Sequence, residues 1–260
     1  MQDDLELERI RELVTGTWGR SLSLRESTES TMDDAFRAAR EGAPDGHVEL
    51  ADHQTRGRGA HGRQWVSPPS SDLYFSVVTR PSVDLSSVAL VTLAAGLGVR
   101  DAVAERVPKK RVLVKWPNDV WIERRKCAGI LVESRSVGER IDPLIIGVGL
   151  NVNRDRWPPE LADTATSLRS ERESSEALGR ASVLASVLSQ MERWFDAFTK
   201  DGPAVVVNGL RPHLALLEEP VRWEDGQGVF EGIGIDGAAR VRTEAGTVSL
   251  HTARIEPIAR

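Results

Sequence analysis

Apolar residues follow the helical period in several segments of the chain. The clearest is 175–199, which Gly202 and Pro203 end. Its apolar positions recur every three to four residues: Val183, Leu184, Val187, Leu188, Met191, Trp194, Phe195 and Phe198. A second helix is predicted over 86–107 and a short one over 3–14.

Ser30 and Asp33 resemble a capping box and open another predicted helix, which ends at Gly42. The Ser30 side chain is therefore expected to cap this helix. Because a helix N-terminus also attracts anions, Ser30 and Thr31 are candidates for ligand contact as well.

Runs rich in β-forming residues alternate with these helices. They predict strands at 47–52, 73–79, 111–114, 129–134 and 143–152.

The pattern changes after about Leu217. Short alternating runs are separated by turn dipeptides such as Asp225-Gly226 and Asp236-Gly237, which predicts a small β-barrel made of hairpins. The expected domains are therefore 1–214, which carries the site, and 215–260, a small β domain.

Composition and charge narrow the function classes. The 260 residues are 40% apolar and 28% charged, with a net charge of -5, which is ordinary for a soluble globular protein and argues against general DNA binding. A lone cysteine, Cys127, fits a reducing cytoplasm. The N-terminus shows no signal peptide, and the uncharged stretch between Asp84 and Arg100 is too short for a membrane span. We expect a cytoplasmic protein that binds neither nucleic acid nor membrane.

The stretch 54–65, QTRGRGAHGRQW, is the most informative part of the sequence. It holds three arginines and three glycines, and no carboxylate occurs from His53 to Ser71. Glycines allow close backbone approach, and arginines supply forked donors for phosphate or carboxylate oxygens. We expect Arg58 and Gly59 to wrap an anionic small molecule and Trp65 to stack on a planar ring. The structural alternative is a solvated basic loop whose Trp65 caps the core.

A second candidate for a ligand-binding segment is Lys115-Trp-Pro-Asn-Asp119. The alternative is an ordinary turn, because Pro-Asn-Asp is a common turn composition. From Arg106 to Lys126 there are eight basic and two acidic residues, which suits a polyphosphate. The side chains of Asn118 and Asp119 could hold a ribose, a metal or a triphosphate.

Two further motifs follow. In Arg125-Lys-Cys-Ala-Gly-Ile-Leu131, Lys126 lies at the start of an apolar strand, where it either faces a ligand or is an ordinary surface lysine. Cys127 has no histidine beside it, so we interpret it as a core residue and not as a nucleophile. In GVGLNVN (147–153), glycines within a strand indicate that another backbone segment or a ligand comes close to it. The alternative is a bulged core strand. Asn151 is the hardest residue there to explain structurally, because a buried amide needs partners.

Together and in this order, QTRGRGAHGRQW, KWPNDV, RKCAGILVE and GVGLNVN resemble the biotin protein ligase family, over about 25–260. The resemblance implies an α+β fold, with a mixed sheet flanked by helices like the catalytic domain of class II synthetases and an SH3-like C-terminal β-barrel. It also implies the ligase-only type, without the N-terminal winged-helix module that binds an operator.

The resemblance implies a two-step reaction. ATP activates biotin to biotinyl-5'-AMP, and biotin is then transferred to a lysine of a biotin carboxyl carrier protein domain of a carboxylase. Mg²⁺ would accompany ATP and be held near Asp119, and the enzyme would be a monomer or homodimer. The catalytic residues would be Lys126, Lys115 and Arg58, whose positive charges would neutralise the reacting anions.

The implied binding residues fall into two sets. Those for biotin are Ser30, Thr31, Met32, Gln54, Arg58, Gly59, Ala60, Lys126 and Gly129. Those for ATP or the adenylate are Arg58, Arg63, Trp65, Lys115, Asn118, Asp119 and Asn151, with Trp65 stacked on adenine.

Two positions depart from the family pattern. Members often have asparagine where Met32 stands, so Met32 is expected to contribute packing alone. Members often have arginine where Ala60 stands, so we expect the intermediate to be held less tightly here.

Two other functions remain open at this point. A lipoate or octanoate protein ligase is the nearest enzyme, since that family resembles this one in fold and chemistry. A biotin-sensing module without catalysis is the non-enzymatic alternative.

Overall fold

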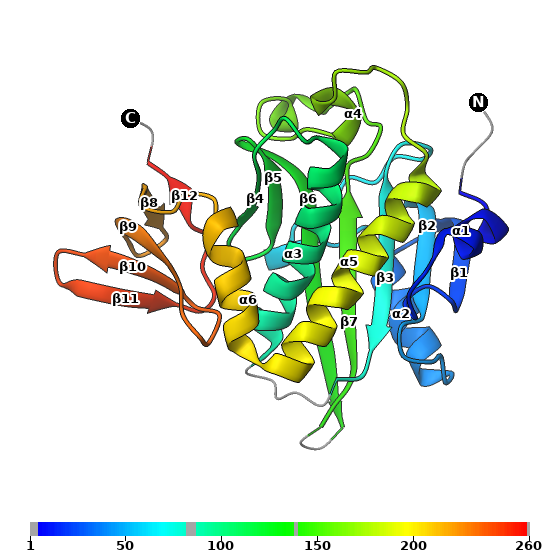
Figure 1. Ribbon diagram of the computed structural model, residues 1–260, viewed down its shortest axis with the longest axis horizontal. Helices are drawn as coiled ribbons and strands as arrows, with labels where there is room; N and C mark the ends of the chain where they lie inside the picture. The colour runs from blue at the N-terminus through cyan, green and yellow to red at the C-terminus, as the bar shows by residue number, and fades with distance from the viewer. Residues whose placement is uncertain (1–4, 82–86, 138–139, 259–260) are drawn as a thin grey trace.

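A seven-stranded mixed sheet forms the centre of the computed structural model, which describes residues 5–81, 87–137 and 140–258 (Figure 1). Its strands are β1 (Leu22–Thr28), β2 (Val48–Gln54), β3 (Leu73–Thr79), β4 (Val112–Lys115), β5 (Asp119–Ile122), β6 (Arg125–Val137) and β7 (Arg140–Leu150). They lie in the order β1-β2-β3-β7-β6-β5-β4. β1 runs parallel to β2, and the other neighbouring strands are antiparallel.

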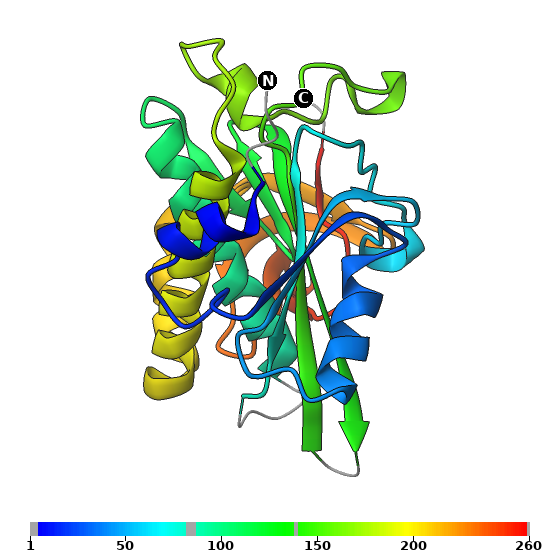
Figure 2. The same cartoon turned by 90° about the vertical axis from the view of Figure 1, so that its right-hand side faces the viewer.

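Helices cover the two faces of this sheet unequally (Figures 1 and 2). One face carries α1 (Leu7–Leu13), α3 (Val88–Arg106), α5 (Arg180–Asp201) and α6 (Pro203–Leu210). α3 is apolar on most sides because it lies between the sheet and α5. Among the described residues, no helix carries an apolar stretch long enough to cross a membrane.

The opposite face is covered by α2 (Thr31–Arg40), which packs on β2, β3 and β7. A small core forms beneath it from Met32, Phe36, Val78 and Ile145, together with Ala35 and Ala39. Because α2 reaches only part of this face, β6 and β7 beyond it stay available to line a cavity.

A second, antiparallel sheet follows in the last quarter of the chain. Its strands are β8 (Pro220–Trp223), β9 (Gly226–Ile233), β10 (Ala239–Thr243), β11 (Gly246–Leu250) and β12 (Glu256–Pro257), in the order β11-β10-β9-β8-β12. Trp116 joins the two sheets, since its Nε1 donates to the carbonyl oxygen of Gly237 at 3.0 Å.

The structure confirms most of the predicted elements. The strand at 73–79 is β3, and the runs at 47–52, 111–114, 129–134 and 143–152 correspond to β2, β4, β6 and β7 within a few residues. The predicted long helix begins at Arg180 rather than at 175. The predicted helix starts at 3 and 86 lie outside the described residues.

Three elements escaped the sequence pattern. β1 is a largely exposed edge strand with few apolar residues, and β5 spans four residues directly after a turn. α5 ends directly before Gly202 and Pro203, as predicted, but Pro203 also opens α6, a helix that was not predicted. Proline suits a first helical turn, whose backbone N–H groups lack helical partners.

Candidate functional site

The loop after β2 folds back on itself and places its arginines and tryptophan beside the sheet. The amide of Gly59 donates to the carbonyl of Arg63 at 2.8 Å, and the amide of Trp65 donates to that of Gly57 at 2.8 Å. A short 3-10 turn, η1 (Ala60–Gly62), forms the tip.

Trp65 lies over the two central strands. A Cβ added at Gly149 would fall 2.3 Å from its indole ring, and one at Gly129 would fall 2.8 Å from it. Only glycine therefore leaves room for the ring at either position. In the described part of the chain, nothing accepts a hydrogen bond from Trp65 Nε1.

The N-terminus of α2 is organised by Gln54 rather than by Ser30. Gln54 Oε1 accepts hydrogen bonds from the amide of Thr31 at 2.9 Å and from its hydroxyl at 3.2 Å. The Thr31 hydroxyl also lies 2.9 Å from that of Ser76. The prediction that the Ser30 side chain caps the helix is wrong, since it makes no capping bond and its hydroxyl meets no partner among the described residues.

A cavity lies between these segments. Its lining includes all nine residues of the expected biotin set, which are Ser30, Thr31, Met32, Gln54, Arg58, Gly59, Ala60, Lys126 and Gly129. Trp65, Asn118, Ile130, Leu131, Gly147, Val148 and Gly149 complete the lining. Apolar and polar groups together line this cavity, as is typical of a site for a small molecule.

Met32 contributes packing to this cavity. A Cβ at Gly147 would lie 2.4 Å from the Met32 sulfur, so the thioether occupies the space that glycine leaves on β7. The expected role of Met32 as an apolar wall agrees with this contact.

A second, wider cavity adjoins the first. It is lined by six cationic and two anionic side chains, which are Arg63, Lys115, Arg124, Lys126, Arg154 and Arg254 with Asp119 and Glu256. Trp65, Trp121 and Trp157 supply aromatic walls. An excess of cations in a protein of net charge -5 makes this cavity suitable for a polyanion.

Lys126 stands at the junction of the two cavities, since it lines both. Its Nζ lies 2.6 Å from Asp119 Oδ1 and 5.1 Å from the centre of the Trp65 ring. Its side chain is 27% exposed, so the alternative of a free surface lysine does not hold.

Lys115 is buried in the wall of the wider cavity. Burial lowers the pKa of its ammonium group to about 8, although nearby Asp119 acts in the opposite direction. Its Nζ lies 5.8 Å from the centre of the Trp121 ring. Lys115 is therefore close to losing its charge at mildly alkaline pH.

Arg58 and Arg63 lie at different places in the loop. Arg58 lines the first cavity, where its guanidinium lies 3.1 Å from Asp33 and 3.4 Å from Glu133. Arg63 lines the wider cavity and donates through Nε to the carbonyl of Ala60 at 3.2 Å. An anion contacting Arg58 would have to compete with two carboxylates.

The side-chain amides of Asn118 and Asn151 hydrogen-bond to backbone carbonyls in the walls of the two cavities. Asn118 Nδ2 donates to the carbonyl of Ile130 at 2.8 Å and lines the first cavity. Asn151 lines the wider one, and its Nδ2 donates to the carbonyl of Thr166 at 2.9 Å. The buried amide of Asn151 thus finds backbone partners.

Cys127 is core, as expected. It is fully buried, and burial raises the pKa of its thiol above the usual range. A buried, protonated thiol is a poor nucleophile.

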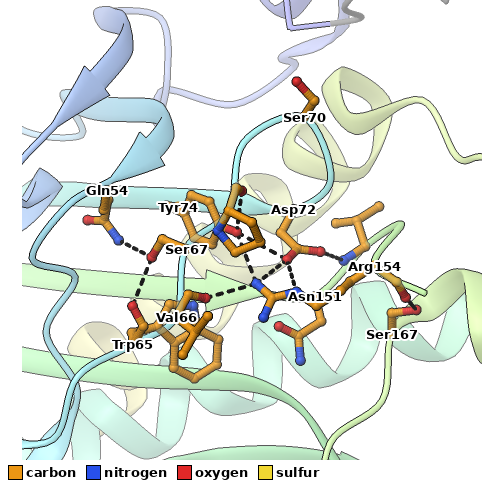
Figure 3. Close-up of polar contacts among 12 residues, drawn as sticks. Gln54, Trp65, Val66, Ser67, Ser70, Asp72, Tyr74, Asn151, Arg154 and Ser167 are labelled. Atoms are coloured by element: carbon orange, nitrogen blue, oxygen red, sulfur yellow. Dashed lines mark hydrogen bonds and ion pairs between the residues drawn. The ribbon is translucent and has the colours of Figure 1, made fainter. Parts of the chain in front are cut away.

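Several lining residues were not found from the sequence. Arg154 and Trp157 follow the GVGLNVN motif, Glu256 lies in β12 of the second sheet, and Arg254 lies in the segment just before β12. Arg154 is buried against Asp72, with Nε donating to Oδ2 at 2.7 Å (Figure 3). No motif marks these positions; only the tertiary structure brings them to the cavity.

Known proteins resemble this chain in both sequence and fold. Residues 24–151 match the family model described as the biotin/lipoate A/B protein ligase family. A bifunctional ligase/repressor BirA of Bacillus spizizenii is 32% identical, with 94% of this chain and 76% of that protein covered. The biotin–[acetyl-CoA-carboxylase] ligase of Paracoccus denitrificans is 30% identical over 88% of this chain and 97% of its own length.

The chain belongs to the biotin protein ligase family. A solved structure of a member from Aquifex aeolicus, in complex with biotin and ATP, matches with a TM-score of 0.79. It is 28% identical and covers 91% of this chain and 98% of that chain. The family thus accounts for the mixed sheet, its helices and the four ordered motifs.

Proposed function

We propose that this protein uses ATP to activate biotin as biotinyl-5'-AMP and then transfers biotin to a lysine of a biotin carboxyl carrier protein domain. The observation that carries the proposal is a pair of adjoining cavities that share Lys126, Gly59, Ala60 and Trp65. One is small and lined by the predicted biotin set, and the other is cationic. Members of the family are named as biotin ligases, which agrees with this arrangement.

In the first step, a carboxylate oxygen of biotin attacks the α-phosphorus of ATP. The bond from that phosphorus to the bridging oxygen breaks, and pyrophosphate leaves. Two anions must approach each other, so positioning and cationic neutralisation supply most of the acceleration. Lys126 lies where the cavities meet, and we assign it, with Lys115 and Arg58, to this neutralisation.

In the second step, the amine of the carrier lysine attacks the carbonyl carbon of the mixed anhydride. An amide forms, AMP leaves and the amine loses a proton. The protein needs no covalent nucleophile for either step, which agrees with the buried thiol of Cys127.

Biotin would lie against the N-terminus of α2, where the Ser30 hydroxyl is available to hydrogen-bond a polar ring. Thr31, Gln54 and Gly129 would complete the pocket, with Met32, Gly59 and Ala60 lining it. ATP would occupy the wider cavity, with adenine on Trp65 and phosphates near Arg63 and Asn151, and would reach Asn118 in the adjoining first cavity.

Mg²⁺ is proposed to arrive with the nucleotide. Within the described ranges, no three His, Cys, Asp or Glu side chains form a metal-binding cluster. Mg²⁺ bound by phosphates needs only one or two protein carboxylates, and Asp119 in the wall of the wider cavity meets that need. The ion would neutralise charge on the phosphates.

The organisation of the protein is proposed as well. Residues 1–214 would form the catalytic domain and 215–260 an SH3-like domain, whose antiparallel sheet supports that assignment. We expect the protein to be cytoplasmic, to bind neither nucleic acid nor membrane, and to act as a monomer or homodimer.

The test is ATP–pyrophosphate exchange with purified protein, measured with biotin, with lipoate and with neither. We expect exchange that depends on biotin, followed by transfer of biotin to an isolated carrier domain. Exchange with lipoate alone would identify a lipoate ligase. Tight biotin binding without exchange would identify a sensor and overturn the proposal.

A further inference from the structure

A buried ion pair lies behind the wider cavity. Asp72 is fully buried, and its Oδ2 accepts from Arg154 Nε at 2.7 Å and from the Tyr74 hydroxyl at 3.1 Å. Its Oδ1 accepts from the amide of Val152 at 2.8 Å. Arg154 NH2 also lies 2.5 Å from the same Oδ2, so Asp72 holds the guanidinium through two of its nitrogens.

The same guanidinium also reaches the loop that follows β2. Arg154 NH2 donates to the carbonyl of Val66 at 2.8 Å, as Figure 3 shows, and lies 3.1 Å from the Tyr74 hydroxyl. Val66 directly follows Trp65. Arg154 also lies over Trp157, with its guanidinium carbon 4.9 Å from the ring centre, and both line the wider cavity.

The backbone around Trp65 is held at three points. The Trp65 amide donates to the carbonyl of Gly57, and the Trp65 carbonyl accepts from the Ser67 hydroxyl at 3.1 Å. Ser67 is itself held by Gln54 Nε2 at 3.0 Å. The third point is the bond from Arg154 to Val66, on the side of the wider cavity.

We propose that Arg154 is a positioning residue for the nucleotide, acting through the carbonyl of Val66 to hold the Trp65 ring over Gly149. This rests on the proposed function, in which Trp65 stacks on adenine. Arg154 makes the bond on the nucleotide side of Trp65, whereas Gln54 and Thr31 organise the biotin side. Loss of the bond from Arg154 to Val66 therefore weakens the binding of ATP and leaves the binding of biotin unchanged.

Two substitutions separate this role from simple stabilisation. Arg154→Ala is unsuitable because it leaves the buried Asp72 carboxylate without its cation, which unfolds many proteins. Arg154→Lys keeps a positive charge for Asp72 but lacks the fork that also reaches Val66. Tyr74→Phe is the matched control, because it removes a hydroxyl from the same network and leaves the bond from Arg154 to Val66.

KM values for ATP and for biotin are measured by exchange, after thermal unfolding has shown that both variants fold. For Arg154→Lys we expect the KM for ATP to rise on the order of tenfold, as for the loss of one hydrogen bond from a charged donor, with the KM for biotin unchanged. For Tyr74→Phe we expect both KM values to stay unchanged.

An unchanged KM for ATP in Arg154→Lys would overturn the proposal. Equal rises for both substrates would overturn it too, because that is the result of general loosening. A rise in Tyr74→Phe as large as in Arg154→Lys would assign the effect to the whole network and not to Val66. Absence of exchange in the wild-type protein would instead overturn the proposed function, and this inference with it.

Discussion

Gly129 and Gly149 face each other across β6 and β7, and the Trp65 ring lies over both. A methyl group at 149 would fall 2.3 to 2.7 Å from three atoms of that ring, which has to move. We predict that Gly149→Ala raises the KM for ATP roughly tenfold or more, which is the effect expected from the loss of one stacking contact. The KM is measured by exchange.

The control for this substitution is Gly96→Ala in α3, where an added Cβ meets its nearest neighbour at an ordinary 3.5 Å. It should leave both KM values unchanged and stabilise the protein slightly, because alanine favours a helix. If Gly149→Ala left the KM for ATP at its wild-type value, Trp65 would have no part in nucleotide binding.

Lys126→Ala is predicted to abolish or severely reduce adenylate formation. The ammonium at the junction of the cavities is the cation best placed between the two reacting anions, and alanine removes it. Biotin-dependent release of pyrophosphate measures the loss. Lys109→Ala, at an exposed ion pair with Glu173, should behave as wild type. Normal release from Lys126→Ala would remove this lysine from the site.

The burial of Lys115 predicts a pH dependence. Its pKa is about 8, so kcat/KM for ATP should fall as pH rises through that value and the ammonium becomes neutral. Stability should respond in the opposite direction. Between pH 8 and the ordinary lysine pKa near 10, the unfolded chain binds the extra proton, so the contribution of Lys115 to stability grows with pH.

Lys115→Arg tests this assignment, because a guanidinium stays charged throughout that range. The alkaline fall in kcat/KM should then disappear, even if the rate at neutral pH is lower. The same alkaline fall in Lys115→Arg would mean that another group titrates.

The Ser30 hydroxyl, which meets no partner among the described residues, predicts a difference between its effects on biotin affinity and on stability. Ser30→Ala should weaken biotin binding, measured by titration, and leave urea unfolding nearly unchanged because no cap is lost. Ser167→Ala is the contrast: its Oγ caps α4 (Leu168–Glu171) by accepting from the amide of Ser170, so its loss should cost about 1 kcal/mol. Equal destabilisation by the two substitutions would contradict the structure.

Ala60 borders both cavities and brings no charge. We predict that Ala60→Arg slows release of biotinyl-AMP, because an added cation attracts the phosphate of the intermediate. Ala60→Gln adds length without charge and should slow release much less. Release is followed by chasing bound intermediate with unlabelled biotin; an unchanged rate in Ala60→Arg would refute the idea.

Much of the fold and site could be predicted from local signals. The apolar residues of α5 follow the helical period, and β3 is a continuous run rich in β-forming residues, so both could be read directly. In contrast, β1 and β5 form because neighbouring strands supply hydrogen bonds. Motifs pointed to Lys126 and Trp65, and the structure places both in the lining of the two cavities. Sequence reasoning misassigned Ser30, because the competing acceptor, Gln54, lies far away in the chain and takes the role of the cap.

By itself, the sequence determined the chemistry: which cations, glycines and aromatic rings are present, in what order, and which family they belong to. The tertiary structure alone decided that Lys126 stands between two cavities, that Arg154 supports the loop of Trp65 and that Arg254 comes within reach of the site. Periodicity and motifs record contacts between residues near each other in the chain. Pairings over dozens of residues depend on how the sheets pack, and that packing leaves no local signature.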